Sequence, residues 1–132
     1  MNVVLLSNSR DRIEAIRAAL KRRGVGCTVV PDEEHASTAI QMGREGVFVI
    51  DSETTGDLGR VLQNRSQSWP ILVLTRRFDS SAWVEMFKAG ASEVIGDPLH
   101  PAKLDAAFDG FIGPLQIQSA WRGIARWLRI GK

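Results

Sequence analysis

Five short runs of apolar residues recur along the chain, and each contains several β-branched or long aliphatic side chains. Runs of this length and composition are typical of strands that are buried on both faces of a parallel sheet. We predict strands over 2–6, 26–30, 47–50, 71–74 and 92–96, and the more polar start of the last run favours an edge of the sheet.

Each strand is followed by a segment whose apolar residues have the three- and four-residue spacing of a helix. In the first segment Ile13, Ile16 and Leu20 are in phase, and any of the polar residues 7–9 can cap the helix. Further helices are predicted after Pro31, over 58–65, after Asp79 or Ser80, and over 102–111.

Five strands alternating with five helices predict an α/β, doubly wound, flavodoxin-like (βα)5 fold. The expected order of its five-stranded parallel sheet is 2-1-3-4-5. Gly113 and Pro114 interrupt the pattern after the fifth helix. We therefore predict a domain over 1–112 and a C-terminal segment over 113–132 that contains an amphipathic helix.

The composition adds expectations about compartment and partners. The single Cys27 excludes an internal disulfide and fits a reducing compartment. No signal peptide precedes the first strand, and no apolar run reaches the roughly 20 residues that span a bilayer. We therefore expect a cytoplasmic protein. Residues 1–112 carry a net charge of −2 and residues 113–132 carry +4, so the domain lacks the basic excess typical of nucleic-acid binding.

Polar residues stand where four of the predicted strands end. Asp51 follows the third strand directly, Ser7 and Asn8 follow the first, Thr75 ends the fourth and Asp97 follows the fifth. The carboxyl ends of parallel strands lie along one edge of the sheet, and ligands collect there. We expect these side chains to surround Asp51 in one crevice.

Several other types of site are disfavoured by the sequence. The first strand is not followed by a glycine-rich dinucleotide or Walker motif, and residues 7–9 contain no glycine for a flavin phosphate loop. His35 and His100 have no cysteine or second histidine at ligand spacing, so both are expected to be solvated. We therefore expect no resident metal or cofactor.

The chain resembles the receiver domain of bacterial two-component response regulators. The resemblance covers residues 2–112. It rests on Val-Phe-Val-Ile-Asp at 47–51, Ile-Leu-Val-Leu-Thr at 71–75, Lys-Ala-Gly-Ala at 88–91 and Asp-Pro at 97–98, with Gly59 eight residues after the aspartate. It implies that Asp51 corresponds to the family's phosphoacceptor and Thr75 to its phosphoryl-contacting hydroxyl.

The chain departs from the family at the positions that phosphoryl transfer uses. Ser7 and Asn8 replace the acid pair that holds Mg²⁺, so Asp51 is the one carboxylate left, and we expect no bound Mg²⁺. Asp97 replaces the family's lysine that contacts the phosphoryl group, so attraction becomes repulsion. Two unit charges about 4 Å apart interact by roughly 4 kcal/mol at an effective dielectric near 20. Arg76 replaces a small residue. These changes imply a degenerate pseudo-receiver.

Alternative interpretations of these residues remain open. Ser7, Asn8 and Ser9 can serve only as helix caps, and Thr75 can simply close its strand. Arg76 can hold Asp51 in an ion pair. An active receiver, phosphorylated on Asp51 by a histidine kinase or a small phosphodonor, would recruit its cation and countercharge elsewhere, with Glu53 and Arg76 as candidates.

The segment over 117–130 has the pattern of a basic amphipathic helix. Its apolar face is formed by Trp121, Ile124, Trp127 and Leu128, and its arginines at 122, 126 and 129 lie largely on another face. We expect this helix to pack on its own domain, on a second copy or on a partner, or to begin a linker. Contact with a membrane surface is the less favoured alternative.

The resemblance also implies a surface for association, formed by the fourth helix, fifth strand and fifth helix. Its residues here would be Trp83, Phe87, Lys88, Asp105 and Asp109, and the tail would add Trp121 and Trp127. The roughly 20 residues after the domain are too few for an output domain. We therefore expect a non-enzymatic protein-interaction module that recruits a protein partner or forms a homodimer.

Overall fold

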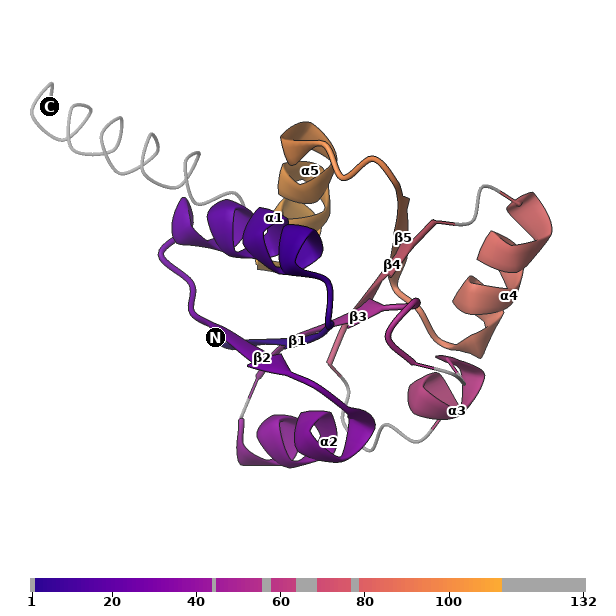
Figure 1. Cartoon of the computed structure of the whole chain (residues 1–132), viewed down its shortest axis with the longest axis horizontal. Helices are drawn as coiled ribbons and strands as arrows, with labels where there is room; N and C mark the ends of the chain where they lie inside the picture. The colour runs from indigo at the N-terminus through magenta and orange to yellow at the C-terminus, as the bar shows by residue number, and fades with distance from the viewer. Residues whose placement is uncertain (1, 44, 56–57, 64–68, 77–78, 113–132) are drawn as a thin grey trace, which may run out of the picture.

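The computed structural model describes residues 2–43, 45–55, 58–63, 69–76 and 79–112. In this part of the chain a central sheet is covered by helices on both faces (Figure 1). All strand pairs are parallel, and the order is β2-β1-β3-β4-β5. The predicted flavodoxin-like fold and strand order are confirmed. The strands are β1 (Asn2–Leu6), β2 (Cys27–Val30), β3 (Gly46–Asp51), β4 (Ile71–Thr75) and β5 (Glu93–Gly96).

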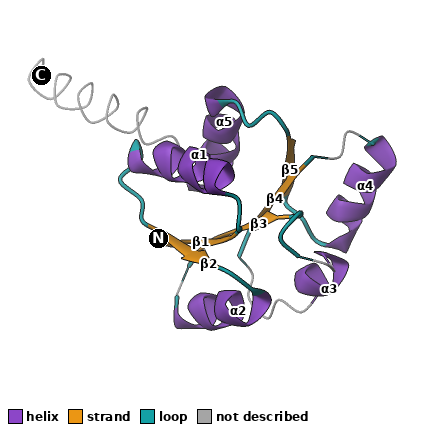
Figure 2. Ribbon diagram, viewed as in Figure 1, coloured by secondary structure: helices purple, strands orange, loops and turns teal. Residues whose placement is uncertain are grey.

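The helices form two layers, one on each face of the sheet (Figure 2). α1 (Arg10–Lys21) and α5 (Pro101–Ile112) pack on one face, while α2 (Glu33–Met42), α3 (Leu58–Gln63) and α4 (Ser80–Ala89) pack on the other. The bounds agree closely with the prediction. Residues 64–65 of the predicted third helix, and the whole helix predicted over 117–130, lie outside the described residues.

The alternation of side chains along β1 explains the two layers. Val3 and Leu5 belong to the apolar cluster under α1 and α5, whereas Val4 and Leu6 belong to the cluster under α2, α3 and α4. All four side chains are essentially inaccessible to solvent. Burying a side chain of this size contributes roughly 1.5–3 kcal/mol, so both faces of β1 stabilise the fold. β5 lies at an edge, as predicted.

Helix capping follows the polar residues of the connections. The side chains of Ser9, Asp32 and Asp79 accept hydrogen bonds from backbone N–H groups in the first turns of α1, α2 and α4. Such caps satisfy donors that have no partner within the helix. In the described part of the chain, none of the helices combines the length and apolar character needed to cross a bilayer.

The strand register fixes the edge of the sheet where a site can form. Leu6 is paired with Ile50, Asp51 with Leu74, and Thr75 with Gly96. The residues that end or follow β1, β3, β4 and β5 therefore lie side by side at the carboxyl edge. This juxtaposition was predicted from the sequence.

Gly46 at the start of β3 is tightly enclosed. A Cβ at this position would overlap the backbone carbonyl oxygen of Asn2 and lie 2.8 Å from the ring of the buried Trp69. We predict that Gly46→Ala lowers the free energy of unfolding by about 1–3 kcal/mol, because a rigid backbone and a packed indole must move. Urea denaturation measures the loss. The matched control is Gly26→Ala, whose Cβ would meet nothing within 4 Å, and equal effects of the two changes would contradict this packing.

Candidate functional site

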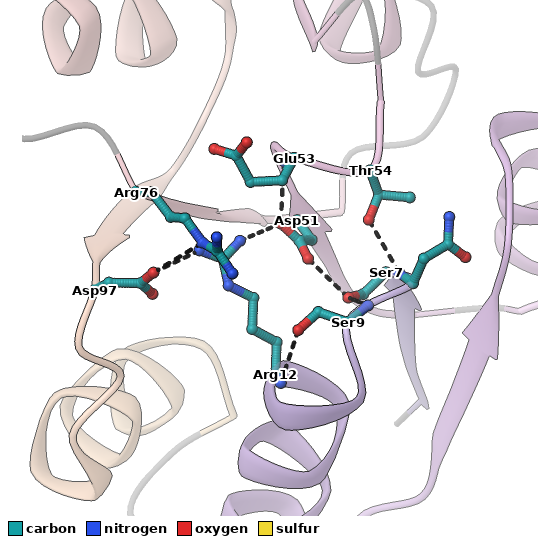
Figure 3. A network of polar contacts seen from close by, with 9 residues as sticks. Ser7, Ser9, Arg12, Asp51, Glu53, Thr54, Arg76 and Asp97 are labelled. Carbon is teal, nitrogen blue, oxygen red and sulfur yellow. Dashed lines mark hydrogen bonds and ion pairs between the residues drawn. The ribbon is translucent and has the colours of Figure 1, made fainter.

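The carboxylate of Asp51 is the buried centre of the site, with 1% of its side chain exposed. The hydroxyl of Ser7, directly after β1, donates a hydrogen bond to Asp51 Oδ2 at 2.8 Å. The backbone N–H of Glu53 donates to Asp51 Oδ1 at 3.1 Å. Figure 3 shows these groups converging on the end of β3. Adjacent strand ends thus provide neutral donors to a buried anion.

The main countercharge of Asp51 comes from α1. The Arg12 guanidinium donates through Nη1 to Asp51 Oδ1 and through Nη2 to Asp97 Oδ2, the latter at 2.9 Å. Only 5% of the Arg12 side chain is exposed. The planar, fork-shaped guanidinium suits two carboxylates on different elements better than an ammonium group does. Arg12 therefore bridges the ends of β3 and β5.

Arg76 has a different partner from the one considered in the sequence analysis. Its Nε lies 3.3 Å from Asp97 Oδ2, and 65% of its side chain is exposed. The ion pair considered between Arg76 and Asp51 is therefore replaced by one between Arg12 and Asp51. Arg12 was not predicted to lie in the site, whereas Asp97 was, and Asp97 contacts both arginines (Figure 3).

We call Ser7, Arg12, Asp51, Asp97 and Arg76 the Arg12 network. Formal charges alternate along it from Asp51 to Arg12, Asp97 and Arg76. Desolvating an ion pair costs several kcal/mol per ion, and attraction offsets this cost only with good geometry and additional hydrogen bonds. The donors from residues 7 and 53 supply such bonds to the most deeply buried anion.

The helical phase of α1 explains how Arg12 reaches the site. Ser9 begins the helix as its cap, and Arg12 lies in the first turn. Arg12, Ile16 and Leu20 are spaced four residues apart, and all three are buried on the same face of the helix. A charged residue in phase with the buried apolar positions was the sequence signal that could have identified Arg12.

Residues 7–9 combine capping with a role in the site. The Ser7 hydroxyl accepts a hydrogen bond from the backbone N–H of Ser9 at 3.1 Å while it donates to Asp51. The backbone N–H of Asn8 donates to Thr54 Oγ1 at 3.0 Å, and Asn8 is exposed to solvent. Capping is therefore the role of Ser9, whereas Ser7 is part of the network.

The remaining predicted site residues are also at this edge. Thr75 is fully buried at the end of β4. Glu53 contributes its backbone N–H, and the residue is exposed. An open groove of about 560 Å³ borders the network and is lined by Arg12, Arg76 and Asp97 together with Ser9, Asp11 and Leu99.

The donor set at Asp51 bears on whether a metal could be held here. The oxygens of its carboxylate already accept hydrogen bonds from Arg12, Ser7 and the Glu53 backbone. Within the described ranges, no three side chains of His, Cys, Asp or Glu are grouped as a metal site would require. Positive charge beside Asp51 is instead provided by a guanidinium.

Among the described residues, three titratable groups with shifted pKa values lie outside this site. Burial raises the pKa of the Cys27 thiol, since a thiolate is disfavoured away from water. The backbone N–H of His35 hydrogen-bonds to the Asp32 side chain and, together with the His35 ring 2.8 Å from Asp32 Oδ1, lowers the pKa of Asp32. The hydrogen bond to the Asp32 side chain in turn raises the pKa of His35. His35 and His100 are both exposed to solvent.

The residues expected to form an association surface divide into two groups. Phe87 and Lys88 are exposed on α4, and Trp83 lines a groove beside β5 and α5. Asp105 and Asp109 instead form ion pairs with arginines at the end of α1, Arg22–Asp105 at 2.9 Å and Arg23–Asp109 at 2.5 Å. These two carboxylates connect α5 to α1. Trp121 and Trp127 lie outside the described residues.

Comparisons with known proteins give one relative by sequence. No protein-family model matches the chain. The two-component response regulator PhoP of Pseudomonas aeruginosa is 31% identical over 97 residues, which cover 70% of this chain and 43% of that protein. The chain thus spans less than half the length of this curated relative.

Solved structures give a broader likeness. The receiver domain of a Pseudomonas aeruginosa sensor histidine kinase, with a magnesium ion coordinated in its active-site cleft, has a TM-score of 0.70 and 19% identity over 85% of this chain and 97% of that chain. The chemotaxis response regulator CheY4 of Vibrio cholerae has a TM-score of 0.72 and 22% identity over 83% and 97%. A Clostridium difficile response regulator has a TM-score of 0.76 and 14% identity over 85% and 95%. The chain has the receiver-domain fold, and the predicted resemblance is confirmed.

The Arg12 network makes a prediction about stability. We expect Arg12→Met to lower the free energy of unfolding by about 3–5 kcal/mol, because it leaves the buried Asp51 carboxylate without its countercharge. Adding Asp51→Asn should recover part of this loss, with a coupling energy of about 1–3 kcal/mol in the double-mutant cycle. Urea denaturation of the native chain, the two single variants and the double variant measures the coupling energy.

The matched control for this cycle is Arg10→Met. The Arg10 side chain is 91% exposed and lies 3.7 Å from Glu14 on the same helix. Its loss should change stability by no more than about 0.5 kcal/mol. Additive effects of Arg12→Met and Asp51→Asn would show that the two side chains do not interact in solution.

Proposed function

We propose that the chain, which has the receiver-domain fold, acts as a phosphorylation-independent protein-interaction module in bacterial signal transduction. The observation that supports this proposal is the contact of the buried Arg12 guanidinium with both Asp51 and Asp97. In this proposal the domain covers 1–112, the segment over 113–132 assists binding, and the module is cytoplasmic and has no catalytic activity of its own.

The hydrogen bonds that the Asp51 carboxylate already accepts argue against its phosphorylation. An acceptor aspartate must approach the phosphorus atom with a free oxygen, and a divalent cation must neutralise charge on the transferring group. Asp51 is instead held from three directions, by Arg12, by Ser7 and by the Glu53 backbone. Breaking these contacts would expose the buried carboxylate to an incoming anion before any chemistry could begin.

The residues beside Asp51 are also poor ligands for Mg²⁺. This ion prefers carboxylate oxygens in a strict octahedral arrangement. Ser7 provides a hydroxyl that already donates to Asp51, and the Asn8 residue is exposed. Positively charged Arg12 would lie next to a cation bound at Asp51. We therefore propose that the module works without Mg²⁺, unlike the histidine-kinase receiver domain solved with that ion.

The alternative is an active receiver that is phosphorylated on Asp51. It is favoured by the position of Asp51 at the carboxyl end of β3 and by the two guanidinium groups nearby, since arginine binds phosphate well. In this alternative Arg12 would turn from Asp51 to the phosphoryl oxygens. The negative charge of Asp97 beside both arginines opposes such a rearrangement.

The first test is the reaction of the full chain with acetyl phosphate in the presence of Mg²⁺. We expect no gain in mass of about 80 Da, the mass of one phosphoryl group, because Asp51 and its countercharge remain paired. Intact-mass spectrometry measures the product, and Asp51→Asn is the matched control. An adduct on the native chain that is absent from Asp51→Asn would overturn the proposal in favour of the alternative.

The second test concerns the association surface on α4. Phe87 is 43% exposed there, whereas Met42, at the end of α2, is 82% exposed. We expect that a protein captured by the full chain is retained by Asp51→Asn, because binding does not need the phosphoacceptor. Phe87→Glu should reduce its recovery at least about tenfold, the effect of losing roughly 1.4 kcal/mol.

Met42→Glu is the control for the second test, since it places the same charge on the other edge of the domain. Recovery should remain unchanged in this variant. Quantitative pull-down with the four baits distinguishes the outcomes. Loss of the partner in Asp51→Asn would link binding to the phosphoacceptor, and equal recovery with Phe87→Glu would place binding on another surface.

A further inference from the structure

A groove of about 350 Å³ lies between α4, β5 and α5. Its apolar lining includes Trp83 from α4, Val94 and Ile95 from β5, and Ala106 and Ala107 from α5. The small alanine side chains leave room for a larger apolar group to pack against the helix. The charged residues Glu93 and Lys103 also line it, and both are exposed. The groove therefore has the character of a site for an amphipathic segment.

Exposed apolar side chains are present on α4, one of the helices that line this groove. Among the described residues, the large apolar side chains that are exposed are Met42, Val84 and Phe87, and two of these are on α4, the helix that contributes Trp83. Val84 is 49% exposed and Phe87 is 43% exposed. Exposed apolar side chains on a helix that lines a partly apolar groove are consistent with an interaction site.

The chain itself supplies a segment that can reach the groove. The groove is lined by Ala106 and Ala107, and α5 ends a few residues later at Ile112. Twenty residues of sequence follow, beginning with Gly113 and Pro114, which favour a turn. A helix over 117–130 would be about 21 Å long, and α5 is about 18 Å long at 1.5 Å per residue. After one reversal, such a helix would extend along the whole of α5.

Composition and available carboxylates favour the groove over the other side of α5 as the docking site. The segment carries +4, and the exposed Glu85 and Glu93 lie on the α4 and β5 side, together with the exposed Lys88 and Lys103. On the α1 side, Asp105 and Asp109 are already paired with Arg22 and Arg23, so these carboxylates are less available to a basic segment. The apolar face of the segment, with Trp121, Ile124 and Trp127, matches the apolar lining of the groove in character.

We infer that residues 113–132 dock in the groove between α4, β5 and α5 of their own domain. Because the segment is attached directly to α5, its effective concentration at the groove reaches the millimolar range, well above that of a second copy in dilute solution. One consequence rests on the proposed function: a partner that binds through α4 would contact a surface that includes this segment, which is how the segment would assist binding. The docking itself does not depend on the state of Asp51.

The test is disulfide cross-linking in the full chain with Cys27→Ser. Ala106→Cys places one thiol in the groove, and Ala120→Cys places the other on the apolar face of the predicted tail helix without removing a large side chain. We expect oxidised glutathione to close an intramolecular disulfide roughly tenfold or more faster than in a control pair, because docking holds the thiols together. Non-reducing electrophoresis and thiol alkylation follow the reaction.

The control pair is Ser37→Cys with Ala120→Cys, since Ser37 is exposed on α2 at the opposite edge of the sheet. Adding Trp127→Glu to the groove pair should slow closure to the control rate, and Arg126→Ala should not. Equal rates for the two pairs would overturn the inference. Cross-linked dimers that increase with protein concentration would also overturn it and identify a second copy as the occupant.

The outcome is separable from that of the proposed function. Repeating the groove experiment with Asp51→Asn should leave the closure rate unchanged, because the cross-link reports only on the tail. A failed cross-link would leave the acetyl phosphate result intact, and a phosphoryl adduct on Asp51 would leave the cross-link intact. A closure rate that changed with Asp51→Asn would contradict docking that is independent of the site.

Discussion

The pairing of Arg12 with Asp51 is the interaction on which the carboxyl edge of the sheet depends. A carboxylate with 1% of its side chain exposed requires a countercharge, and the guanidinium of α1 provides it. The same guanidinium contacts Asp97, so one side chain joins α1 to the ends of β3 and β5. Arg76 extends this connection to the loop after β4. Four segments that are distant in sequence are held by one alternating set of charges.

The countercharge of Asp51 is a side chain of the same domain, not an ion from solution. In an open crevice, a cation or phosphoryl group arriving from solution could change the charge balance and shift the loops after β4 and β5. Here the balancing cation belongs to the chain, and it is positioned by the cap at Ser9 and by packing of the α1 face that also contains Ile16. A ligand could shift these loops only if it bound two arrangements with different affinity. The contacts of Arg12 with Asp51 and Asp97 stabilise the arrangement seen in this structure.

The sequence was sufficient to predict the fold and the meeting of Ser7, Asp51, Thr75 and Asp97, since buried strands and parallel topology determine which strand ends are neighbours. Arg12 was not predicted, because the apolar residues that define the buried face of α1 do not reveal that a charged residue shares this face. The direction of a long side chain in a loop is not encoded by spacing, which is why Arg76 was considered a partner of Asp51. Asp105 and Asp109 likewise face α1, a choice set by packing of α5 through Leu104 and Phe108.

Charged groups and exposed apolar groups are located in different parts of the domain. Charge is balanced internally at the carboxyl edge, whereas apolar surface at Val84 and Phe87 remains accessible on α4. Binding energy is available where apolar surface is in contact with water. A protein segment that covered Val84 and Phe87 would gain this energy without any chemistry at Asp51.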